Sequence, residues 1–138
     1  MQVTLVPKEH INDIWPRIKK YAEKCAKYTY GRYTAEDIRK QAISDKAIQL
    51  WVPFDKDDVY GFYVTEIVDY PQMRALAMHF IGGTRFKEWQ FVGWPILQKF
   101  ARDNNCKVIE SYGRPGWKKM WQGYGYETQF IFYKLPVE

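Results

Sequence analysis

Three strand-like runs in the middle of the chain constrain the fold most. Residues 47–54, 59–68 and 73–81 are strand-like, and the second run, "VYGFYVTEIV", is rich in β-branched and aromatic residues. Two short turns separate the runs, at residues 55–58 and around Pro71. Because a parallel crossover needs a much longer connection, the runs predict an antiparallel meander. The last run is apolar on both alternating faces, which is typical of a central strand.

Helical patterns flank these strands. Apolar residues at three- and four-residue steps predict a helix over about residues 9–28, and Thr34 with Asp37 resembles the capping box of a second helix. A third helix is expected to end near Asn104, with its regular part either beginning near Pro95 or kinked there. The remaining predicted elements are a first strand at 2–6, a strand at 106–111, a helix at 115–122 and a final strand at 127–135. The predicted fold class is therefore α/β of the α+β kind, with a mixed, mostly antiparallel central sheet flanked by helices.

Composition indicates one compact domain, residues 1–138. Of these 138 residues, 46% are hydrophobic and 18% aromatic, which excludes a disordered chain. No run reaches the roughly 20 apolar residues of a membrane span, and no signal peptide is visible. We therefore expect the protein in the cytoplasm. If the source is a phage, the expected setting is the host cytoplasm or the virion. His10, His79, Cys25 and Cys106 lack ligand spacing, which predicts no metal site and two buried thiols.

The stretch "IGGTRFKEW", residues 81–89, stands between a strand and a helix, where a phosphate group is often bound. Gly82 and Gly83 are followed by two cations, Arg85 and Lys87. A bulky Phe and the carboxylate of Glu88 oppose an anion at the same place. The stretch is thus open to two interpretations, a phosphate cradle or a simple turn from strand to helix.

The order of elements, together with two motifs, resembles the GCN5-related N-acetyltransferase family over nearly the whole chain. The family's pyrophosphate loop has the form Arg/Gln-x-x-Gly-x-Gly/Ala, and Arg85 corresponds to its leading basic residue. Where the family's loop then carries glycines, this chain has Phe86, Glu88 and Gln90. The late stretch "RPGWKKMWQGYGYE" resembles the family's last helix, with Gly125 and Tyr126 on its closing Gly-Phe pair. The family's Tyr, often the general acid, falls on Trp121, whose indole does not readily give up a proton.

This resemblance implies acetyl-CoA as cofactor and an unidentified amine as acceptor. The implied cofactor contacts are the main chain of Met78, Phe80 and Ile81 and the loop residues Gly82, Gly83, Arg85 and Lys87. For acid–base chemistry the resemblance directs attention to Glu66 and His79, with Glu110 as another carboxylate and Tyr124 or Tyr112 as a substitute acid.

Two further interpretations stay open. The scaffold could serve a non-catalytic role, binding a protein partner or forming part of a virion, since small proteins of this appearance also occur in bacteriophages.

The net charge of +5 permits an anionic partner. Nucleic acid would contact a basic ridge of Arg17, Lys20, Lys24 and Lys27 together with Arg114, Lys118 and Lys119, although no recognised nucleic-acid motif accompanies it.

Overall fold

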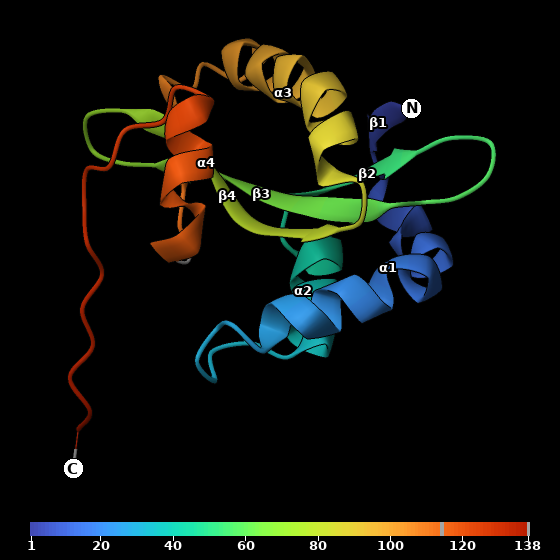
Figure 1. The fold of residues 1–138 in the computed structure, drawn as a ribbon, viewed down its shortest axis with the longest axis horizontal. Helices are drawn as coiled ribbons and strands as arrows, with labels where there is room; N and C mark the ends of the chain where they lie inside the picture. The colour runs from blue at the N-terminus through green and yellow to red at the C-terminus, as the bar shows by residue number, and fades with distance from the viewer. Residues whose placement is uncertain (114, 138) are drawn as a thin grey trace.

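A five-stranded sheet forms the centre of the protein in a computed structural model that describes residues 1–113 and 115–137 (Figure 1). The strands follow one another in the order of the chain: β1 Gln2–Leu5, β2 Ile48–Phe54, β3 Gly61–Asp69, β4 Arg74–Gly83 and β5 Val108–Ser111. The first four strands are antiparallel, and β5 is parallel to β4. The predicted meander and the mixed, mostly antiparallel sheet are confirmed.

Helices cover both faces of this sheet. On one side, η1 Lys8–His10 leads into α1 Ile11–Ala26, and α2 Ala35–Ser44 follows; on the other lie α3 Phe86–Asp103, η2 Pro115–Trp117 and α4 Lys118–Gly123 (Figure 1). The expected capping box is present, because Thr34 Oγ1 accepts from the Asp37 amide while Asp37 accepts from the Thr34 amide. These caps fix where α2 begins.

Two apolar clusters pack against the sheet. The first joins α1 and α2 to one face and includes Ile18, Ile38 and Phe62. The second joins α3 and α4 to the opposite face and includes Trp89 and Trp121. The central strands are buried on both faces by this arrangement, which explains their nearly continuous apolar sequence.

Two predicted elements differ from the structure. The third helix already begins at Phe86, so Pro95 lies inside it and does not mark its start. The predicted final strand at 127–135 is wrong: residues 124–137 form no helix or strand. A run of β-branched and aromatic residues becomes a strand only where it finds a hydrogen-bonding edge, and this segment leaves the domain instead (Figure 1).

Two irregularities mark β4: a β-bulge in its pairing with β3, and an early end to its pairing with β5. Val64 is opposite Phe80 and Thr65 is opposite Met78, so His79 is the additional residue on β4. On the other side, pairing with β5 ends where Met78 meets Ser111, although β4 continues to Gly83. The sheet therefore opens at His79, and the last part of β4 extends beyond β5.

Candidate functional site

Two of the predicted catalytic side chains lie together beside the β-bulge. Glu66 extends from β3 and His79 from β4, and Glu66 Oε1 lies 2.7 Å from His79 Nε2. Both side chains are about 70% buried, with exposures of 30% and 28%. A carboxylate can only accept a hydrogen bond, so in this geometry His79 Nε2 is the donor to Glu66. Such a pair can take up and hold a proton.

A small pocket of about 140 Å³ borders this pair on the α1–α2 side of the sheet. Its walls come from β2, β3, β4, α2 and the loop that precedes α2. The lining residues other than the pair itself are Tyr33, Gln41, Asp45, Ile48, Val64 and Phe80. Sequence patterns did not single out Tyr33, Gln41 or Asp45, because each lies far along the chain from β3 and β4. Only the folding of α2 against β2 brings them to the pocket.

The other carboxylate candidate, Glu110, lies across β4 from Glu66. Ala77 is paired with Glu66 on one side and with Glu110 on the other, so the small side chain of Ala77 separates the two carboxylates on one face of the sheet. Glu110 accepts a hydrogen bond from the Tyr70 hydroxyl. This hydrogen bond, together with partial burial, raises the pKa of Tyr70 to about 12.

The predicted cofactor contacts on β4 divide between the two faces of the sheet. Phe80 packs with the α1–α2 cluster, whereas Met78 and Ile81 belong to the α3–α4 cluster. Beyond Met78, the described residues supply no strand partner on the β5 side. Backbone groups at the sheet opening are thus available to pair with an extended ligand that carries amides.

The glycines that follow β4 are explained by close packing. A side chain at Gly83, where φ is +139°, would place Cβ 2.2 Å from the Tyr60 carbonyl oxygen. At Gly82, Cβ would lie 2.9 Å from the Phe62 ring and 3.0 Å from Cys25 Sγ. The β3–β4 contact therefore requires both glycines whether or not a phosphate binds.

Arg85 has acidic and aromatic partners in its own chain. Its Nη2 lies 2.6 Å from Glu88 Oε2, and its guanidinium lies 4.5 Å from the centre of the Tyr60 ring. Asp55 is 3.9 Å away. Lys87 is exposed and makes no ion pair among the described residues. The described residues also offer no acceptor for the amides of Phe86 and Lys87, so the start of α3 keeps two backbone donors for an anion.

Tyr124, the third predicted catalytic residue, is separated from the Glu66–His79 pair by the sheet. It packs against the α3–α4 cluster, with its ring centre 6.3 Å from that of Trp121. Trp121 is 7% exposed, and its indole N–H has no partner among the described residues. Tyr112, the other substitute acid, is 66% exposed.

A buried polar pair was not anticipated from the sequence. The Tyr63 hydroxyl donates to Gln90 Oε1, and both side chains are buried. Gln90 Nε2 and the Tyr126 hydroxyl have no partner among the described residues. Burial raises the pKa values of Tyr63 and Tyr126 well above that of an exposed phenol. Because their helical and strand positions look like ordinary core positions, nothing in the sequence marked this pair.

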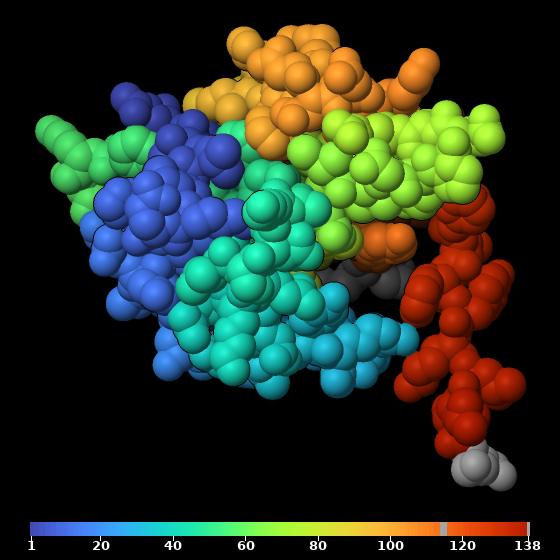
Figure 2. Space-filling model, turned by 180° about the vertical axis from the view of Figure 1, so that it is seen from behind, coloured from blue at the N-terminus to red at the C-terminus, as the bar shows by residue number. Residues whose placement is uncertain are grey.

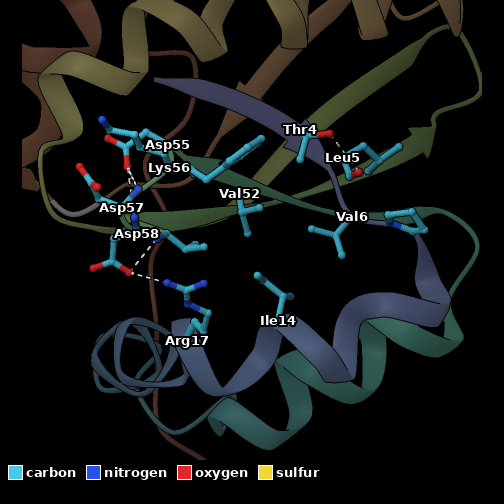
Figure 3. Close-up of a pocket in the computed structure, with 13 residues that line it drawn as sticks. Thr4, Leu5, Val6, Ile14, Arg17, Val52, Asp55, Lys56, Asp57 and Asp58 are labelled. Carbon is cyan, nitrogen blue, oxygen red and sulfur yellow. Dashed lines mark hydrogen bonds and ion pairs between the residues drawn. The ribbon is translucent and has the colours of Figure 1, made fainter.

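A larger pocket, of about 490 Å³, lies at the other end of the sheet (Figure 3). It is bounded by β1, α1 and the turn between β2 and β3, with Val6, Ile14 and Val52 on its apolar side. Arg17 Nη2 lies 3.1 Å from Asp58 Oδ1 at its rim. None of the site residues predicted from the sequence lines this pocket. The Arg17–Asp58 ion pair also means that the basic ridge on α1 is partly neutralised.

The remaining expectations concern cysteines, cations, metals and membranes. Cys25 and Cys106 are half-buried rather than fully buried, and burial raises the pKa of Cys106. Arg114, part of the predicted basic surface, lies outside the described residues.

Across residues 1–113 and 115–137, no three His, Cys, Asp or Glu side chains gather as metal ligands. In the same ranges, no helix is long and apolar enough to cross a bilayer.

Comparison by sequence finds no matching family model and no curated relative. Comparison by structure does find matches. A probable acetyltransferase superposes with a TM-score of 0.71 at 18% identity, covering 100% of this chain and 99% of the other. A ribosomal-protein-alanine N-acetyltransferase from Brucella melitensis superposes with a TM-score of 0.72 at 13% identity, with coverage of 99% and 100%.

A third match, an aminoglycoside acetyltransferase from an uncultured soil sample in complex with sisomicin, has a TM-score of 0.71 at 6% identity and covers 99% of this chain and 96% of the other. These identities are too low to carry a substrate or a set of catalytic residues from one protein to another, but the superpositions extend over nearly the whole length of each chain. The five-stranded mixed sheet and its flanking helices agree with them. The chain has the fold of the GCN5-related N-acetyltransferases.

Proposed function

We propose that the protein transfers an acyl group from acyl-CoA to an amine. The observation that carries this proposal is the Glu66–His79 pair at 2.7 Å, next to a pocket at the place where β4 leaves β5. A protonated amine cannot attack a carbonyl, so this chemistry requires a base beside the acceptor. His79 is suited to accept the proton, and Glu66 to hold the resulting imidazolium. The acyl thioester would supply the activated carbonyl: the amine nitrogen forms the new C–N bond, the C–S bond breaks, and CoA leaves as the thiol with a proton that the amine has lost.

The cofactor would bind on the edge of β4. The unpaired backbone beyond Met78 suits the amides of an extended pantetheine chain, because a strand edge pairs with any extended amide backbone. At the start of α3, the amides of Phe86 and Lys87 and the Lys87 ammonium suit a pyrophosphate. Arg85 can contribute only by leaving Glu88. The other predicted contacts, Phe80, Ile81, Gly82 and Gly83, would act through their main chain.

Binding can be measured by isothermal titration of acetyl-CoA into the wild-type protein, the Lys87→Glu variant and the Lys24→Glu control. Lys24 lies on the exposed face of α1, so its substitution changes the net charge equally without touching the loop. We expect micromolar affinity for the wild type and the control, and a loss of about tenfold or more for Lys87→Glu. Absence of heat with folded wild-type protein would exclude the cofactor and, with it, the proposed activity.

A non-catalytic binding role is the second candidate, and the contacts of Arg85 favour it. The Arg85 guanidinium already contacts the carboxylates of Glu88 and Asp55 and the ring of Tyr60. In addition, Trp121 corresponds to the family's Tyr, which is often the general acid. Such a protein would retain the fold for its surface. It would be folded, would not bind acetyl-CoA and would release no CoA thiol in the presence of amines, an outcome that the same titration and a thiol-release assay detect.

A further inference from the structure

The segment after α4 is apolar, extended and solvent-exposed. We call residues 127–137 the C-terminal arm. It runs away from the sheet beside α4 in Figure 1 and projects beyond the body of the molecule in Figure 2. Its large apolar side chains are between 69% and 98% exposed: Phe130, Ile131, Phe132, Tyr133, Leu135 and Val137. A continuous apolar surface of this kind marks a site of contact.

The arm's own domain leaves it almost uncovered. The Arg32 guanidinium lies 5.3 Å from the centre of the Phe132 ring, yet that residue remains 73% exposed. Side chains alternate along an extended chain, so Phe130 and Phe132 face one way and Ile131 and Tyr133 the other. Over residues 130–133 both faces of the arm are therefore apolar, as in a strand enclosed between two layers, and Lys134 follows on the face of Phe130 and Phe132.

The sheet ends in an edge that fits such a strand. β5 is the last strand of the sheet and is paired only with β4 among the described residues. An unpaired edge exposes a row of N–H and C=O groups that readily bind another extended segment. At this edge Val108 is 41% exposed, and Tyr112, just after β5, is 66% exposed. The protein thus carries both an unpaired edge and an unpaired strand.

We propose that two copies of this chain exchange their C-terminal arms, each arm adding a strand to the β5 edge of the other copy. A second copy is favoured over the arm's own edge for two reasons. The arm leads away from its own sheet, as Figure 1 shows. Moreover, α3 covers only one side of β5, while α1 packs against β3 and β4 and α2 against β2. A strand added at the β5 edge would thus be covered on one side by the α3 of the copy that receives it. The domain of the other copy would cover its second side.

Exchange of identical arms closes on itself as a two-fold dimer. Each copy gives one arm and receives one, so both arms and both β5 edges are used within the pair and the exchange closes at two chains. The charged and polar residues at the start of the arm, Glu127 to Gln129, would stay near the crossing point. This inference does not depend on acyl transfer, because it uses neither the Glu66–His79 pair nor the start of α3.

Sedimentation velocity on the full chain over a wide range of concentrations tests the proposal. We compare the full chain with a chain that ends at Tyr126, and Phe132→Glu with the control Thr128→Glu. The full chain and Thr128→Glu are expected to be dimers. The shortened chain and Phe132→Glu are expected to be monomers that keep the circular dichroism spectrum and thermal midpoint of a folded domain.

A monomeric full chain at every concentration would overturn the proposal, and so would a dimer that persists without the arm. Pairing with the arm's own edge is distinguished by NMR on a mixture of isotope-labelled and unlabelled chains. Nuclear Overhauser contacts between the arm of one chain and β5 of the other are expected, whereas contacts found only within a chain would refute the exchange. Hydrogen exchange should show β5 amides protected in the full chain and exposed in the shortened one.

Discussion

Glu66 Oε1 lies 2.7 Å from His79 Nε2, and the pair is formed across two strands at a β-bulge. Glu66 is paired with Ala77, so His79, two residues later, lies on the same face of the sheet as Glu66 by alternation. At the bulge, Phe80 also faces the α1–α2 side, next to His79. The pairing of β4 with β5 ends one residue earlier, at Met78, so the base and the end of this pairing are neighbours in the proposed site.

Glu66→Gln and His79→Gln are expected to reduce kcat by about 10²- to 10⁴-fold once an acceptor amine is found, because each removes part of the base. The KM for acyl-CoA should change little, since neither side chain is proposed to contact the nucleotide. Steady-state kinetics of CoA thiol release measure both constants. Glu110→Gln is the matched control: if it lowers kcat as strongly, the base is not the Glu66–His79 pair.

Glu88→Gln is expected to tighten acetyl-CoA binding several-fold. The substitution releases Arg85 from its ion pair at 2.6 Å and removes a negative charge from the start of α3. Isothermal titration against wild type measures the change, and Glu23→Gln, on the exposed face of α1, controls for net charge. An unchanged affinity would show that no phosphate sits at this helix end.

Gly83→Ala is expected to destabilise the fold by about 1–3 kcal/mol or more, because Cβ would overlap the Tyr60 carbonyl oxygen at 2.2 Å and the backbone has φ of +139°. Urea denaturation gives the free energy of unfolding. Gly116→Ala is the control, since nothing lies within 4 Å of its Cβ. Equal losses for the two variants would contradict the packing explanation.

Lys8→Met is expected to cost about 1–3 kcal/mol of unfolding free energy. The Lys8 ammonium donates to the carbonyl oxygens of Ala42, Asp45 and Ile48, joining η1 to the end of α2, and the variant removes this donor from all three. Partial burial lowers the pKa of Lys8, consistent with an enclosed ammonium. The exposed Lys46→Met is the control, for which chemical denaturation should find almost no change.

Asp37→Asn is expected to lower the melting temperature at neutral pH but not in strong acid. The hydrogen bond from the Thr34 amide lowers the pKa of Asp37 in the folded protein. A lowered folded pKa gives stability that is complete above the usual pKa of Asp and is lost as the pH falls through the folded value. Calorimetry at several pH values should therefore show the wild-type and variant curves converging in acid, and a constant difference would refute the capping role.

The predictable part of the fold came from local patterns. The three-strand meander, the two helices before it and the capping box at Thr34 follow from side-chain periodicity and cap chemistry, which act over a few residues. Glu66 and His79 could be singled out for the same reason, as titratable residues within apolar strands. Their mutual distance could not, because it depends on the register in which β3 pairs with β4.

The sequence by itself determined which segments can be helix or strand. Tertiary structure decided the rest. It placed Tyr33, Gln41 and Asp45 around the pocket, and it gave Arg85 acidic partners. It also left residues 127–135 without a strand partner despite their β-forming composition. The physical reason is common to all three: contacts between residues distant in the chain, and the pairing of a strand with an edge, depend on register and on available partners that no local pattern encodes.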